Sequence, residues 1–183
     1  MTEERKAFNI AENIFSVMCA LMKNLPKRME YIRNNGMLWF NDPLMCQTYN
    51  MSLGFYGFDN AAHKLLSFSK AFDMAEFYAY APKRESLPDG VERVGSLAEL
   101  FEKSKIVSVH NAAETEIIGP EHFAKLRDGG MYINLYDAKI RDENALMREL
   151  ESGRIRAGLI GWHKNAEVTG KWNNLIMIGD SLR

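Results

Sequence analysis

Residues 51–65 form the stretch of this sequence that is best suited to binding chemistry. They read as an apolar strand over 52–56, a tight turn at Gly57 and a helix that begins near Asn60. This layout is typical of a dinucleotide-binding corner, where loop amides and the positive end of a helix hold a pyrophosphate. A G-x-G-x-x-G pattern that begins at Gly57 has Asp59 and Ala62 in place of its second and third glycines. The loop residues expected to meet a cofactor are Gly57, Phe58, Asp59, Asn60 and Ala61.

Asp59 is the substitution with the larger consequence. Its carboxylate stands just before the predicted helix, where aspartate is a favoured N-cap. A negative charge at this point would take the place that a phosphate needs. We therefore predict a loop whose anion site is filled by the chain's own side chain. Alanine at position 62 is a milder change, because this pattern also admits a small residue as its last member.

The four histidines are the remaining candidates for chemistry. His63, His110 and His122 are expected to be ordinary helix or strand-end residues. His110 is a partial exception, because ligands gather at the carboxyl ends of strands in open α/β sheets. His163 and Asp180 could pair as an imidazole held by a carboxylate, but a loop histidine and an unrelated terminal aspartate are expected instead. No spacing of histidines, cysteines or carboxylates predicts a metal site.

The composition argues against several functional classes. The chain has 183 residues, a hydrophobic share of 46% and a formal net charge of -1. This charge gives no reason to expect nucleic acid or an anionic membrane as a partner. No apolar run approaches the roughly 20 residues of a membrane span, and the first residues lack the apolar centre of a signal peptide. We expect a cytoplasmic protein with reduced cysteines.

A long amphipathic helix is predicted over residues 9–34, with Asn9 as its cap, a kink or break at Pro26 and an end at Gly36. Its apolar residues recur at helical spacing: Ile10, Ile14, Val17, Met18, Leu21 and Leu25. Because the helix precedes the first strand, it must dock on a sheet face or on a second subunit. Residues 37–50 read as an irregular arm.

Short apolar strands then alternate with helices to the end of the chain. The predicted strands are 52–56, 75–80, 105–109, 131–135, 156–160 and 174–178, and the predicted helices are 60–72, 97–102, 120–126 and 142–152. Residues 83–95 are polar and predicted to form a loop. This alternation predicts an α/β fold with a doubly wound parallel sheet, Rossmann-like, in three α/β/α layers and preceded by a long helix.

Six motifs follow one another along the chain, and together they carry a family resemblance. They are Ile10-Ala-Glu-Asn, Leu53-Gly-Phe-Tyr-Gly, Lys70-Ala-Phe-Asp-Met, Ile106-Val-Ser-Val-His, Leu126-Arg-Asp-Gly-Gly-Met-Tyr-Ile-Asn and Asp142-Glu-Asn-Ala-Leu. They resemble V-A-E-H, L-G-I-I-G, K-A-F-G-M, V-V-S-L-H, M-K-P-G-A-I-L-I-N and D-E-D-A-L of the D-isomer-specific 2-hydroxyacid dehydrogenases. The resemblance is to the NAD-binding domain of those enzymes, including the glycerate and phosphoglycerate dehydrogenases.

The resemblance has consequences for organisation. In that family the helix matching Ile10-Ala-Glu-Asn carries the subunit interface, which implies a homodimer through the N-terminal helix. The family builds its substrate domain from segments before this helix and after the last strand. Residues 1–183 would then be one nucleotide-binding-type domain, with the helix and arm over 1–50, a Rossmann core over 51–183 and no substrate-binding domain.

The positions that carry catalysis in the family are altered in this sequence. Asp137 stands where the family has an arginine that binds the substrate carboxylate, which reverses the charge. Asp180 stands at the position of the histidine that acts as general acid and base, and Asn165 at the position of its glutamate partner. The loop register leaves Glu167 or His163 as alternatives near the glutamate position. Aspartate, with an unperturbed pKa of about 3.9, is poorly matched to proton transfer at neutral pH.

The resemblance also implies which residues lie near a cofactor. Ala81 replaces the acidic residue that hydrogen-bonds the adenosine ribose, and His110 and Tyr136 fall at further cofactor positions. The basic residues at 83 and 84 could indicate NADP, because cations suit a 2′-phosphate. A solvated loop is the preferred interpretation, so the cofactor could be NAD, NADP or none.

Three functional hypotheses follow. The first is a catalytically inactive NAD(P)-binding-domain protein that acts as a dimeric binding or scaffold protein. The second is an active NAD(P)-dependent oxidoreductase on a 2-hydroxy or 2-keto acid, with groups supplied by another chain. The third is a dimerisation module that uses the N-terminal helix, with Ile14 and Val17 in its interface.

Overall fold

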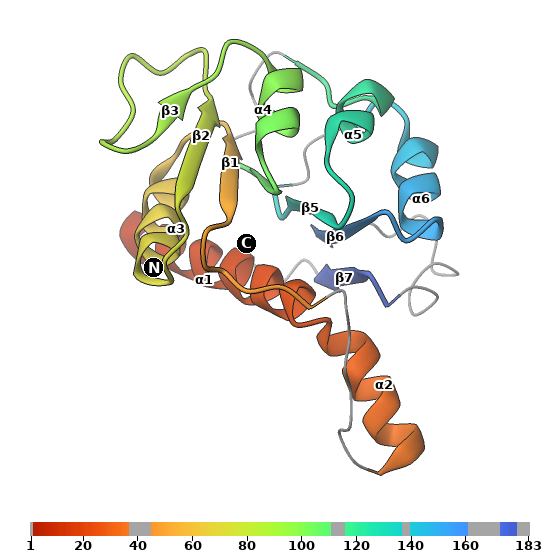
Figure 1. Cartoon of the computed structure of the whole chain (residues 1–183). Coiled ribbons are helices and arrows are strands. Elements are labelled where there is room, and N and C mark those ends of the chain that lie inside the picture. Colours follow the sequence, from red (N-terminus) through yellow and green to blue (C-terminus); the bar gives the residue numbers. More distant parts are fainter. Residues whose placement is uncertain (1, 37–44, 111–115, 137–139, 161–172, 179–183) are drawn as a thin grey trace.

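The computed structural model describes residues 2–36, 45–110, 116–136, 140–160 and 173–178. Its centre is a seven-stranded sheet in the order β3-β2-β1-β4-β5-β6-β7, in which every neighbouring pair is parallel (Figure 1). The strands are β1 Ser52–Tyr56, β2 Glu76–Tyr80, β3 Glu92–Arg93, β4 Ile106–Val109, β5 Gly130–Asn134, β6 Ile155–Ile160 and β7 Leu175–Ile178. β1, β4, β5 and β6 are buried along their whole length, as expected for parallel strands covered on both faces.

Helices cover both faces of the sheet. They are α1 Glu3–Met22, α2 Leu25–Asn35, α3 Asn60–Ala71, α4 Leu97–Lys103, α5 Pro120–Lys125 and α6 Glu143–Glu151. One apolar core joins α1 and α3 to the sheet, and a second joins α4, α5 and α6 to the opposite face. The three-layer Rossmann-like fold and the long N-terminal helix are therefore confirmed. Within the described residues, no helix is both long and apolar enough to cross a membrane.

The helix α1 lies directly on the sheet, and β6 is shaped to receive it. A Cβ atom at Gly158 would lie 2.3 Å from Cγ1 of Val17, so only glycine allows this close approach. The buried guanidinium of Arg156 donates from Nη1 to the Leu21 carbonyl oxygen at 2.6 Å, and the same oxygen accepts the Asn24 N–H at 3.0 Å at the end of α1. Ile14 of α1 is fully buried in the core between this helix and the sheet.

The predicted helix over 9–34 is two helices, so its boundaries were wrong. α1 begins at Glu3, and Thr2 rather than Asn9 is its N-cap. The chain breaks at Asn24, whose φ of 49° is left-handed, and Pro26 lies in the first turn of α2. Proline is tolerated there because the first helical N–H groups have no intrahelical partner. The predicted break near Pro26 and the end at Gly36 are confirmed.

Two smaller expectations also changed. The predicted loop over 83–95 contains the short strand β3, which pairs with Tyr78 and Ala79 of β2. Its two residues are charged and exposed at the sheet edge, so they show no apolar alternation that a sequence pattern could reveal.

Ile14 and Val17 are buried against the chain's own sheet, which contradicts their expected place in a dimer interface.

Candidate functional site

The candidate site lies at the carboxyl edge of the sheet, where β1, β4 and β5 end side by side. The chain leaves β1 through Gly57, whose φ of 76° suits glycine and whose N–H donates to the Tyr80 oxygen at 2.9 Å. At the end of β4, the His110 N–H donates to the Tyr56 oxygen at 2.7 Å. These bonds fix the loop before α3 beside the ends of its two neighbouring strands.

Asp59 closes the N-terminus of α3, as predicted. Its backbone is extended, and its Oδ1 accepts the Ala62 N–H at 2.8 Å. The side chain thereby satisfies one of the free amides that a helix presents at its positive end. A pyrophosphate in a dinucleotide-binding corner depends on these same amides.

Tyr136 reaches the same carboxylate from the far side of the edge. It follows β5, and its N–H donates to Asn134 Oδ1 at 3.3 Å, which directs the chain into a turn. Its hydroxyl donates a short hydrogen bond to Oδ2 of Asp59. The side chain of Tyr136 therefore links the end of β5 to the start of α3 across the end of β4.

His110 lies between these two residues and is fully buried. Its ring is 5.5 Å from the Tyr136 ring, centre to centre, and its Nε2 is 3.0 Å from the Ser108 hydroxyl. Its Nδ1 is 3.3 Å from Asp59 Oδ1, which is within ion-pair range but outside hydrogen-bond geometry. The imidazole therefore adds a polar contact beside the carboxylate but does not directly hydrogen-bond it.

The protonation of the cluster follows from these contacts. Burial favours the neutral acid of Asp59, but His110, the Tyr136 hydroxyl and the Ala62 amide outweigh it and hold the pKa of Asp59 well below its usual range. Burial, the nearby Asp59 charge and the shared hydrogen bond raise the pKa of Tyr136 far above its ordinary value. At neutral pH the cluster is thus a carboxylate held by a neutral phenol.

The segment after β2 is tied to the same loop by two arginines. Arg84 donates from Nη1 to the Phe58 oxygen at 2.6 Å, and its Nη2 is 3.1 Å from His63 Nε2. Burial, followed by the Arg84 charge, lowers the pKa of His63, which agrees with a neutral ring accepting from the guanidinium. Arg93 donates to the oxygen of the buried Ala81 at 2.7 Å. Arg84 and Arg93 therefore stabilise the loops that follow β1 and β2.

The structure brings most of the candidate residues to one edge. The loop residues Gly57 to Ala61, together with Ala81, His110 and Tyr136, all lie at or beside the carboxyl ends of β1, β2, β4 and β5. The sequence did not reveal the Tyr136–Asp59 bond or the part played by Ser108, because both depend on which strands are neighbours. Three altered family positions lie outside the described residues, together with the alternatives to one of them: Asp137, Asn165, Asp180, His163 and Glu167.

Among the described residues, no group of three or more histidine, cysteine or acidic side chains is placed so that it could hold a metal ion. The Cys19 and Cys46 thiols are free. His122 is engaged in structure, because its Nδ1 accepts the Gly119 N–H at 2.9 Å and its Nε2 is 3.2 Å from Glu116.

Comparison with known proteins decides the family. The domain described as D-isomer specific 2-hydroxyacid dehydrogenase, NAD binding domain, matches residues 15–168 of the chain. The chain belongs to this family. Among curated members, the D-3-phosphoglycerate dehydrogenase of Methanocaldococcus jannaschii is 24% identical over 163 residues, which are 86% of this chain and 31% of that protein.

Solved structures of the D-2-hydroxyacid dehydrogenase family share the fold. A phosphoglycerate oxidoreductase from Rhizobium etli superposes with a TM-score of 0.82 at 23% identity, covering 96% of this chain and 56% of that one. A D-lactate dehydrogenase from Aquifex aeolicus, solved with NAD and lactic acid, gives a TM-score of 0.76 at 20% identity and covers 92% and 58%. The chain thus spans about a third to three fifths of the lengths of these three proteins.

Proposed function

We propose that this chain is a catalytically inactive dehydrogenase-type domain that acts as a dimeric binding or scaffold protein. The observation that carries the proposal is the position of Asp59, whose carboxylate caps α3 at the Ala62 amide and accepts from Tyr136. In this view the chain's own anion takes the place of a cofactor pyrophosphate.

Asp59 opposes tight dinucleotide binding both sterically and electrostatically. The second glycine of the pattern lets a pyrophosphate approach the backbone, and Asp59 places a side chain at that point. Two unit negative charges 4 Å apart repel by about 4 kcal/mol at an effective dielectric constant near 20. Displacing the carboxylate would instead break its bond from Tyr136 and leave a half-buried hydroxyl to be satisfied.

The altered catalytic positions support the same proposal from sequence. Asp137 at the arginine position would repel the carboxylate of a 2-hydroxy acid, because the charge there is reversed. Asp180 at the histidine position and Asn165 at the glutamate position remove the acid–base pair that the resemblance implies. Each of the three chemical roles is therefore changed together with the cofactor loop.

The test is a titration of the purified wild-type chain with NAD(H) and NADP(H), followed by hydride-transfer assays on a panel of 2-hydroxy and 2-keto acids. We expect no binding below millimolar concentrations and no turnover. Micromolar binding would contradict the blocked site. Turnover on any of these acids would favour an active NAD(P)-dependent oxidoreductase, in which another chain supplies the missing groups.

A further inference from the structure

His122 is a buried histidine that the candidate site does not use. It is 3% exposed and lies in the first turn of α5, on the face of the sheet opposite to α1 and α3. Its Nδ1 accepts the N–H of Gly119, the residue just before the helix, at 2.9 Å. A side chain at the third helical position that bonds back to this N–H is half of a capping box, and glutamate or glutamine usually provides it. In α5 the same role falls to a residue type that titrates near neutral pH.

The contacts of the His122 ring define its protonation state. A ring nitrogen that accepts a hydrogen bond carries no hydrogen, so the hydrogen of the neutral ring lies on Nε2, 3.2 Å from Glu116 Oε1. A protonated imidazole carries a hydrogen on both nitrogens and can only donate. The Gly119 N–H would then face a second donor. Protonation of His122 and its hydrogen bond from Gly119 therefore exclude each other.

Two carboxylates are placed to receive the protonated ring. Glu116 already lies beside Nε2, and Oε1 of Glu121 lies 3.7 Å from Nδ1. The backbone amide of Glu121, followed by the guanidinium of Arg141, lowers the pKa of Glu121. This carboxylate therefore stays ionised on mild acidification. Opposite charges at this range favour the charged form of an imidazole.

The carboxylate of Glu121 lies directly against the start of α5. A Cβ atom at position 119 would be 2.7 Å from both of its oxygens and 2.5 Å from Nη2 of Arg141, so only glycine leaves room for this ion pair. Arg141 binds Oε2, whereas Oε1 faces the imidazole, so Glu121 can accept from the ring without leaving the arginine. The neighbouring pair of Lys125 with Glu102 of α4 adds no net charge.

Glu116 connects the ring to the candidate site. Its carboxylate faces His122, and its carbonyl oxygen accepts a short hydrogen bond from the hydroxyl of Tyr56. Tyr56 is the last residue of β1, so it stands directly before Gly57 and the loop that leads to α3. A change in the position of segment 116–119 therefore reaches the edge of the sheet where the candidate site lies.

We propose that His122 is a pH-sensitive latch, whose protonation releases the Gly119 amide and loosens segment 116–119 at the rim of the candidate site. In the neutral state the ring closes the start of α5. In the protonated state it turns to the two neighbouring carboxylates, and the first turn of α5 loses the hydrogen bond from its cap residue. The hold on Tyr56 weakens in the same step. The latch requires no nucleotide, so its test is independent of the proposed function.

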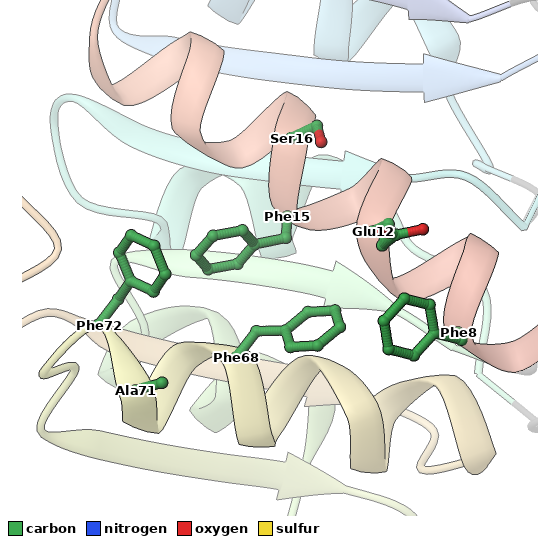
Figure 2. A pocket seen from close by; sticks show the side chains of 7 residues that line it. All are labelled: Phe8, Glu12, Phe15, Ser16, Phe68, Ala71 and Phe72. Atoms are coloured by element: carbon green, nitrogen blue, oxygen red, sulfur yellow. The ribbon is translucent and has the colours of Figure 1, made fainter.

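Nuclear magnetic resonance of the whole chain between about pH 8 and pH 5, the range in which histidines titrate, tests the latch. The His122 ring should carry hydrogen on Nε2 alone at the upper end and on both nitrogens at the lower end. With the same midpoint, the protection factor of the Gly119 amide in hydrogen exchange should fall about fivefold, the effect of one lost hydrogen bond. The Tyr56 Cζ resonance should shift together with it. Phe15 and Phe72 are the internal reference, because they line a groove without histidine between α1 and α3, and their protection should stay constant (Figure 2).

Three variants separate the latch from other effects of acid. His122→Gln keeps an acceptor for the Gly119 N–H but cannot titrate, so Gly119 protection should become independent of pH in this range. Glu121→Gln removes one acceptor of the protonated ring and should move the midpoint to lower pH. His63→Gln, in the first turn of α3, is the matched control and should keep the wild-type response. Far-UV circular dichroism establishes that each variant is folded.

Several results would overturn the latch. One is a His122 ring that stays neutral throughout the range, and another is a ring that titrates while Gly119 protection or the Tyr56 resonance stays constant. A response of His122→Gln equal to that of the wild type would have the same meaning. An equal loss of protection at Phe15 and Phe72 would indicate general unfolding in place of a local change.

Discussion

Replacing Asp59 by glycine should open the cofactor loop. The change restores the second glycine of the pattern and removes the charge that caps α3. Relief of about 4 kcal/mol of repulsion corresponds to roughly a thousandfold gain in affinity at the upper limit. The Asp59 side chain is 26% exposed, so screening by solvent and salt reduces the repulsion and the expected gain in affinity. We expect a gain of about one hundredfold for NADH, measured by isothermal titration calorimetry.

Two further variants separate the causes. Asp59→Asn keeps the shape and a capping oxygen but removes the charge, so it should recover only the electrostatic part of the gain. Asp142→Gly removes the aspartate that caps α6, remote from the cofactor loop, and controls for loss of a cap as such. The reasoning is refuted if neither Asp59 variant binds NADH more tightly than the wild type. A gain in Asp142→Gly equal to that of Asp59→Gly would also refute it.

Further predictions concern stability. Tyr136→Phe removes the donor to Asp59 and should lower the free energy of unfolding in urea by about 1–2 kcal/mol; an unchanged midpoint would contradict the bond. Because the folded pKa of Asp59 is depressed, its stabilisation is present above about pH 4 and is lost as the pH falls towards the folded pKa. The stability difference between wild type and Asp59→Asn should therefore shrink on acidification, and growth would be the wrong sign. Gly158→Ala should cost about 1–3 kcal/mol through its clash with Val17, and Val17→Ala should recover part of the loss. Arg156→Met should lower the thermal midpoint because it removes a buried hydrogen bond from a charged donor to the last turn of α1.

Much of the fold could be predicted because its signals are local. Apolar strands such as the one predicted over 105–109 and the helix capped by Asp59 follow from short patterns, and the cap is confirmed. The elements that were misjudged lack such patterns. Thr2 is intrinsically a weaker cap than Asn9 and still begins α1, so the start of this helix depends on how far its apolar face can pack and not on the cap residue alone.

The candidate site was only partly predictable for a different reason. The N-cap role of Asp59 is a local property and could be predicted from the order of residues. Its bond from Tyr136 joins residues 77 positions apart and exists because β1, β4 and β5 are neighbours in the sheet. Burial of Ile14 and Val17 likewise depends on which face of α1 meets β6, which helical periodicity alone leaves open.

A crystal structure of the wild-type chain soaked with millimolar NADH would test most directly whether Asp59 fills the pyrophosphate site. We predict no dinucleotide density at Gly57 to Ala61, with the Asp59 carboxylate still bonded to the Ala62 amide and the Tyr136 hydroxyl. A pyrophosphate seated on the first turn of α3, with Asp59 turned away from it, would contradict this account.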